Sequence, residues 1–155
     1  MYETIMVAID ASPTAEQALD EAIRLAKSLG SKLVIAHVVD NAHVKYDLSS
    51  PFVREVTAAL AQRGETLISA AIRKAQQAGI QASVAITRDP LTYIDVATEL
   101  ERLAAEAGAQ VLVLGTHGRR GVPRALLGSV AESVVRTSSL PVLLVRNNPD
   151  REAHG

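Results

Sequence analysis

The sequence contains no cysteine, and aromatic residues make up only 3% of its 155 residues. Without cysteine the chain can form no disulfide, no thiolate metal site and no cysteine nucleophile. With so few aromatic rings it offers no stacking platform for single-stranded nucleic acid. Disulfide scaffolds, thiol chemistry and recognition by base stacking are therefore excluded before any motif is considered.

The chain also has little net charge and no long apolar run. Its 16 basic and 17 acidic residues give a formal net charge of −1, which provides no general attraction to DNA or to an anionic membrane. No apolar stretch approaches the roughly 20 residues that cross a bilayer, and residues 1–4 lack the segments of a signal peptide. We expect a cytoplasmic protein that binds neither nucleic acid nor membrane and attracts phosphate only locally.

Hydrophobic residues make up 48% of the chain, which suits one domain with an aliphatic core. Short apolar runs predict strands over residues 5–9, 33–39, 81–87, 110–114 and 140–146. Helical periodicity predicts helices that begin at Ser12-Pro13, Pro51, Asp89-Pro90 and Ser129. On the second helix, the apolar positions expected to face the sheet are Val53, Val56, Leu60, Leu67, Ala71, Ala75 and Ala78. This alternation predicts an α/β fold in which helices cover both faces of an open parallel sheet.

Two glycine clusters flank the most informative stretch of the chain. The fourth apolar run is followed by Gly115-Thr116-His117-Gly118, and Gly128-Ser129 opens the last helix. Three arginines and no acidic residue lie between the clusters: Arg119, Arg120 and Arg124. Glycines expose backbone N–H groups, and a helix N-terminus carries roughly half a positive charge. The stretch therefore predicts a phosphate cradle.

The common phosphate motifs are absent, and the individual residues have simpler interpretations. The turn after the first strand has no glycine, so the dinucleotide fingerprint is missing, and there is no Walker A lysine. Gly115 and Gly118 can equally permit a tight turn. We favour His117 as a residue that shapes this loop over one that acts on phosphate, and His37 as a hydrogen-bonded core residue. Residues 41–50 are either a lid over a ligand or an ordinary surface loop.

Asp10 and Gly115 follow the first and fourth strands. In an open doubly wound sheet, ligands bind beyond the carboxyl ends of the strands, where the strand order reverses. A sheet that places these two strands side by side brings both residues to one crevice. We therefore expect the ligand site there.

These residues carry a resemblance to a known family. The pattern Gly115-x2-Gly118-x9-Gly128-Ser129, with apolar runs before and after it, resembles the ATP-binding branch of the universal stress protein family. The resemblance extends to residues 5–12 and 36–40. It implies a five-stranded Rossmann-like sheet of order 3-2-1-4-5 and a domain over residues 1–146. Residues 147–155 are polar and include Pro149, which predicts a flexible tail. The sequence departs from the family pattern at Arg88-Asp89, before Pro90, where many relatives have a glycine nearby.

The resemblance also implies a set of nucleotide-binding residues. Asp10, with the backbone of Ala8 and Ile9, matches the position near adenine and ribose, and Val38 matches the residue beside adenine. The first part of the nucleotide loop is matched by Leu114, Gly115, His117 and Gly118. The phosphate-holding part is matched by Gly128, Ser129 and Val130, and Arg119 adds an N–H or its charge. The implied ligand is ATP, with Mg²⁺ or Mn²⁺ held by its phosphates and no metal ligand from the protein.

Three functions remain open at this point. The first is an ATP-binding module for stress response, in which nucleotide occupancy changes loop order and partner binding. The second is a slow ATPase or nucleotide-processing enzyme; fast hydrolysis is not expected, because only Asp10 is available as a carboxylate for a metal. The third is a dimeric interaction protein that binds no nucleotide. The resemblance implies a homodimer through the last strand, from Leu140 at its start to Arg146 at its end, and leaves the protein partner unknown.

Overall fold

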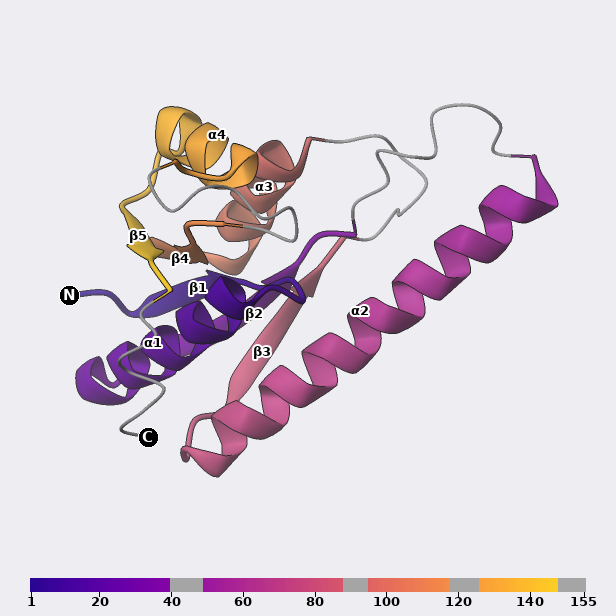
Figure 1. The fold of residues 1–155 in the computed structure, drawn as a ribbon. Helices are drawn as coiled ribbons and strands as arrows, with labels where there is room; N and C mark the ends of the chain where they lie inside the picture. Colours follow the sequence, from indigo (N-terminus) through magenta and orange to yellow (C-terminus); the bar gives the residue numbers. More distant parts are fainter. Residues whose placement is uncertain (40–48, 88–94, 118–125, 148–155) are drawn as a thin grey trace.

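A five-stranded parallel sheet forms the centre of the molecule (Figure 1). The structure is a computed structural model that describes residues 1–39, 49–87, 95–117 and 126–147. Its strands are β1 (Thr4–Ala8), β2 (Lys32–His37), β3 (Ala82–Ile86), β4 (Val111–Gly115) and β5 (Val142–Val145). Its helices are α1 (Pro13–Leu29), α2 (Pro51–Gln77), α3 (Val96–Ala107) and α4 (Ser129–Thr137).

The strand order is β3-β2-β1-β4-β5, which confirms the predicted fold and its order 3-2-1-4-5. The central strand β1 pairs with both β2 and β4; Ile5, for example, lies opposite Leu33 on one side and Val111 on the other. The carboxyl ends of β1 and β4 are therefore neighbours. The switch point of the sheet lies between them.

Two hydrophobic cores cover the two faces of the sheet. On one face, Ile5, Val7 and Ile35 pack with residues of α1 and α2, and we call this the α1–α2 core. On the other, Met6, Val34 and Leu112 pack with residues of α3 and α4, and we call this the α3–α4 core. Successive side chains of a strand point to opposite faces, so each central strand contributes to both cores. Figure 1 shows the sheet between the two helix pairs.

The start of α1 follows the predicted capping signal, and a glycine ends the helix. The Ser12 side chain accepts the N–H of Ala15 at 3.2 Å, with Pro13 as the first helical residue. At the other end, Gly30 adopts φ 69°, in the left-handed region that favours glycine. The start of α1 is thus held in place directly after β1.

The third helix does not begin where the sequence predicted. α3 begins at Val96, and its N-cap is Asp95, whose side chain accepts the Thr98 N–H at 3.2 Å. The predicted start at Asp89-Pro90 is wrong, because an aspartate nearer the apolar face supplies the cap. Residues 88–94, which include the Arg88-Asp89 departure, lie outside the described residues.

The strand ends also differ from the prediction by one or two residues. β5 covers only Val142–Val145, whereas the apolar run predicted residues 140–146. Likewise, β1 ends at Ala8 and β2 at His37. A strand ends where its neighbour stops offering hydrogen-bond partners, and apolarity alone does not report that limit.

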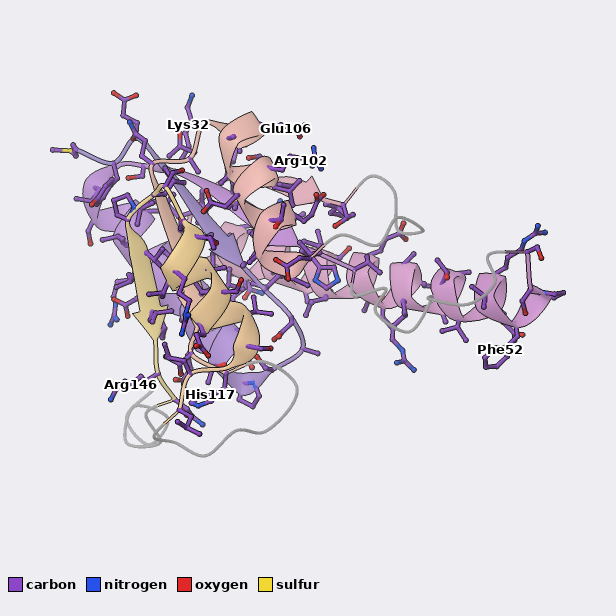
Figure 2. All side chains as sticks on the ribbon, turned by 90° about the horizontal axis from the view of Figure 1, so that it is seen from above. Lys32, Phe52, Arg102, Glu106, His117 and Arg146 are labelled. Carbon is purple, nitrogen blue, oxygen red and sulfur yellow. The ribbon has the colours of Figure 1, made fainter. Side chains whose placement is uncertain are left out.

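Helix α2 is longer than the sheet that it covers. Its 27 residues span about 40 Å, whereas the strands have four to six residues, at about 3.3 Å each. Its N-terminal half extends past the sheet, and Phe52 near its tip is 72% exposed (Figure 2). The predicted inner face is therefore correct only in part: Val53, Val56 and Leu60 are half-buried. The buried positions are Thr57, Gly64, Ile68, Ala71 and Ala75.

None of the helices in the described parts of the chain is long and apolar enough to cross a membrane.

Gly64 lets the middle of α2 approach the ring of His37. A Cβ at residue 64 would lie 2.9 Å from Cδ2 and 3.0 Å from Nε2 of His37. The ring has little freedom to move, because it is buried and its Nδ1 lies 2.9 Å from the Ile9 carbonyl oxygen. The contact explains a glycine in a helix interior, where it normally costs about 0.5–1 kcal/mol.

We expect Gly64→Ala to lower the free energy of unfolding by about 1–3 kcal/mol, because overpacking outweighs the better helix propensity of alanine. Urea denaturation measures the change. In a His37→Ala background the same substitution should instead raise stability, by up to about 1 kcal/mol. A stabilising effect of Gly64→Ala in the otherwise unchanged protein would contradict this packing.

Candidate functional site

Four of the predicted site residues come together at the carboxyl end of the sheet. Ala8 ends β1, Val38 follows β2, Leu114 lies in β4 and Val130 lies in the first turn of α4. Leu114 belongs to the α3–α4 core, and the other three pack against it. Four separate segments of the chain thus bring apolar side chains to the same core. Their contact with a nucleotide stays a prediction.

The turn after β1 is held by backbone hydrogen bonds to β2. The N–H of Ile9 donates to the Ala36 carbonyl at 2.9 Å. The carbonyl of Ile9 lies 2.9 Å from Nδ1 of His37, which must be the protonated nitrogen because a carbonyl only accepts. His37 is buried, so its prediction as a hydrogen-bonded core residue is confirmed. The backbone that carries Asp10 is therefore rigidly placed.

Asp10 uses one carboxylate oxygen to shape this turn. Its Oδ1 accepts the N–H of Ser12 at 2.8 Å. Among the described residues the other oxygen, Oδ2, has no hydrogen-bond partner, and the side chain is half-buried. An ionised carboxylate accepts several hydrogen bonds, so Asp10 retains capacity for a ligand that donates them.

Gly115 is required for a close contact that the sequence did not reveal. A Cβ at this position would lie 2.6 Å from Thr14 Oγ1 and 2.8 Å from the Thr14 backbone carbon. Gly115 is not among the glycines with positive φ. The sequence left two interpretations of Gly115 open, a tight turn and a phosphate loop. Neither of them describes this contact with Thr14. The missing Cβ makes room for the first turn of α1.

The start of α4 is joined to the end of β4. Gly128 donates its N–H to the Thr116 carbonyl at 2.7 Å, and Thr116 donates its own N–H to the Val145 carbonyl at 3.0 Å. Gly128 is the N-cap of α4 and supplies no side-chain cap. The first N–H groups of a helix have no acceptor within the helix, and Ser129 is exposed. The phosphate-holding half of the predicted cradle is therefore open beside the end of β4.

His117 is held in place by hydrogen bonds to its backbone carbonyl and to its ring. Its carbonyl accepts the Thr14 hydroxyl and lies 3.4 Å from Ser12 Oγ, and its Nδ1 lies 3.0 Å from Thr116 Oγ1. Its Nε2 is buried and has no partner among the described residues. These contacts agree with a residue that shapes the turn. Figure 2 places His117 and Arg146, which follow neighbouring strands, at one end of the sheet.

Several predicted residues lie outside the described part of the chain. These are Gly118 and Arg119, the loop arginines Arg120 and Arg124, and most of the suggested lid, residues 41–48. The tail beyond Asn147 lies outside it as well. Thr14 is the residue that sequence reasoning missed, because Ser-Pro-Thr indicates only a helix start. Its contact with His117 joins positions that are 103 residues apart.

A cavity of about 300 Å³ lies between α1 and α2, on the other face of the sheet. Apolar side chains such as Leu19 and Leu67 line it, together with Asp10 and Lys74. Lys74 Nζ lies 2.7 Å from Asp20 Oδ1. Partial burial lowers the pKa of Lys74, but the hydrogen bonds and charges of Asp20 and Glu16 outweigh it, so the pKa lies above its ordinary value. The sequence did not predict this cavity.

Comparison with known proteins gives a consistent result. The family model described as "Universal stress protein family" matches residues 1–146. The universal stress protein YxiE of Bacillus subtilis is 31% identical over 153 residues, which cover 94% of this chain and 100% of that protein. A crystal structure of a universal stress protein family member from Burkholderia pseudomallei is 32% identical, with a TM-score of 0.73 and coverage of 93% and 96%.

One solved structure of this kind contains a ligand. It is described as a universal stress protein in complex with cAMP and is 26% identical to this chain, with a TM-score of 0.62. The match covers 95% of this chain and 99% of that protein.

We expect Gly115→Ala to lower the free energy of unfolding by about 1–3 kcal/mol, because its Cβ overlaps the first turn of α1. Thermal and urea denaturation measure the loss. A Thr14→Ala background should not restore stability, since the clash with the Thr14 backbone carbon remains. Unchanged stability of Gly115→Ala would show that this contact is looser than described.

Proposed function

This chain belongs to the universal stress protein family, and on that premise we propose that it binds an adenine nucleotide, ATP in particular. The nucleotide lies in the crevice at the carboxyl ends of β1 and β4. The observation that carries this proposal is the Gly128 N–H bond to the Thr116 carbonyl, because it holds the open start of α4 beside the switch point. A phosphate bound there accepts from free helix N–H groups and lies at the positive end of the helix dipole.

Each part of the nucleotide has a matching surface in the crevice. The base packs against the apolar surface of Ala8, Val38 and Leu114, which supports a flat aromatic group. The free Oδ2 of Asp10 accepts from ribose hydroxyls, while its Oδ1 keeps the turn closed through Ser12. The phosphates bind at Ser129 and at the N–H groups around it.

The known ligand of one relative supports the class of molecule. The solved structure with cAMP is 26% identical and matches almost the whole chain. Its ligand has the same base and ribose as ATP. The preference for a triphosphate is our own proposal, and it rests on the open N-terminus of α4.

The energetics are sufficient for weak to moderate affinity. Three or four charge-assisted hydrogen bonds, at roughly 1.5–3 kcal/mol each, supply much of the roughly 8 kcal/mol of a micromolar complex. The described residues contain no group of three or more metal-binding side chains. We propose that Mg²⁺ or Mn²⁺ enters with the phosphates and that the site serves binding, with hydrolysis at most slow.

We further propose a homodimer through β5. This strand is at the edge of the sheet, beside β4, and Leu143 is 36% exposed. On the neighbouring helix α4, Val135 is 49% exposed. An uncovered edge strand with apolar side chains readily pairs with another copy. The last residue of β5, Val145, accepts the N–H of Thr116, so nucleotide binding beside Thr116 can influence the dimer and the surface shown to partners.

We expect Asp10→Asn to weaken ATP binding about tenfold, because it exchanges the free carboxylate oxygen for an amide while an oxygen still accepts from Ser12. Isothermal titration calorimetry measures the change. The control Asp20→Ala removes an exposed aspartate of α1 that pairs with Lys74, and should bind like the unchanged protein. The absence of any heat with millimolar ATP, ADP and AMP would refute the proposed function.

We expect sedimentation velocity to show a dimer at micromolar concentration. Leu143→Glu should convert it to a monomer, because it places like charges face to face at the β5 edge. The matched control is Val84→Glu on the opposite edge strand, β3, where Val84 is 40% exposed. It should remain a dimer. A monomeric unchanged protein, or loss of the dimer in Val84→Glu alone, would refute pairing through β5.

A further inference from the structure

Two hydroxyl groups at the start of α1 converge on one carbonyl after β4. Thr14 donates its hydroxyl to the His117 carbonyl oxygen, and Ser12 Oγ lies 3.4 Å from the same oxygen. Both hydroxyl-bearing residues are buried, with 5% and 6% of their surfaces exposed. Ser12 already accepts the Ala15 N–H as the helix cap. Ser12 Oγ lies near the limit of hydrogen-bond distance from the carbonyl, so the Thr14 hydroxyl is the main donor to it.

The carbonyl of the preceding residue, Thr116, is held by the start of α4. The Thr116 carbonyl accepts the Gly128 N–H at 2.7 Å. The start of α4 is therefore bonded to the Thr116 carbonyl, and the start of α1 to the His117 carbonyl. The two bonds together hold the backbone of Thr116 and His117 directly after β4. The contact of Gly115 with Thr14 adds a steric limit at the same place.

The first turn of α1 thereby connects the two halves of the crevice. On one side, Ser12 donates its N–H to Asp10, the residue proposed for ribose. On the other, Thr14 holds His117, next to Thr116, whose carbonyl accepts the N–H of Gly128 at the proposed phosphate site. The Thr14 hydroxyl also lies 3.4 Å from Ser12 Oγ, but Ser12 bonds Asp10 through its backbone N–H, which does not depend on that hydroxyl. Loss of the Thr14 hydroxyl should loosen the phosphate side and leave the nucleoside side in place.

We propose that Thr14 is a positioning residue that determines the preference of the site for nucleotides with a longer phosphate chain. The inference rests on the proposed function, and it assigns to Thr14 a role in selectivity. Thr14 acts through the His117 carbonyl and does not itself contact the nucleotide. An unbonded carbonyl in a half-buried position turns toward water to recover a donor, and the phosphate-binding groups then lose their common orientation.

The test compares ATP and AMP affinity in matched variants of the full chain by isothermal titration calorimetry. Thr14→Val has nearly the same shape but lacks the hydroxyl, and should bind ATP about fivefold more weakly. Its AMP affinity should change by less than about twofold. Thr14→Ser retains the hydroxyl and should keep the ATP preference. The control Thr66→Val removes a hydroxyl that donates to the Gln62 carbonyl at an exposed position of α2, and should have no effect.

The outcomes separate this inference from the proposed function. If the unchanged protein binds neither nucleotide, both proposals are wrong. If it binds ATP and Thr14→Val binds ATP equally well, or loses ATP and AMP affinity to the same extent, only the role of Thr14 is refuted. Thermal melting verifies that each variant is folded; should Thr14→Val not fold, Thr14→Ala, which removes the same hydroxyl, carries the same expectations.

Discussion

The close packing of the first turn of α1 against the last residue of β4 determines the shape of the crevice. A side chain at residue 115 would collide with the backbone of Thr14, so glycine is needed where these two elements meet. The same approach brings the Thr14 hydroxyl to the His117 carbonyl. The turn after β1 and the segment after β4 are thus joined at one point. Loops that bind ligands are usually placed by a rigid scaffold in this way.

The sheet makes this packing possible, because β1 and β4 are neighbours and both of its faces are buried. A second close approach places the other side of the crevice. Gly64 allows α2 to contact His37, and His37 holds the Ile9 carbonyl. Two glycines in different elements therefore have a comparable role: each lets a neighbouring element come close enough to fix backbone next to Asp10 or Thr116.

Much of the fold could be predicted from local sequence. Apolar periodicity located the nine elements, and Ser12 with Pro13 indicated the start of α1. The start of α3 could not be predicted, since Asp89 and Asp95 are both good N-caps and only packing selects between them. The predicted inner face of α2 is only half-buried near Val53 for a related reason. Periodicity indicates a face of the helix, but not how far the sheet extends beneath it.

The sequence by itself determined the element types, the start of α1 and the aliphatic core, and the pattern Gly115-x2-Gly118-x9-Gly128-Ser129 with its flanking apolar runs carried the resemblance to the family. These features depend on residues a few positions apart, where propensity and periodicity act. Only the tertiary structure decided that Gly115 makes room for Thr14 and that Thr14 holds His117. Those contacts join residues about a hundred positions apart, and no local pattern carries information about which distant segments the folded sheet brings together.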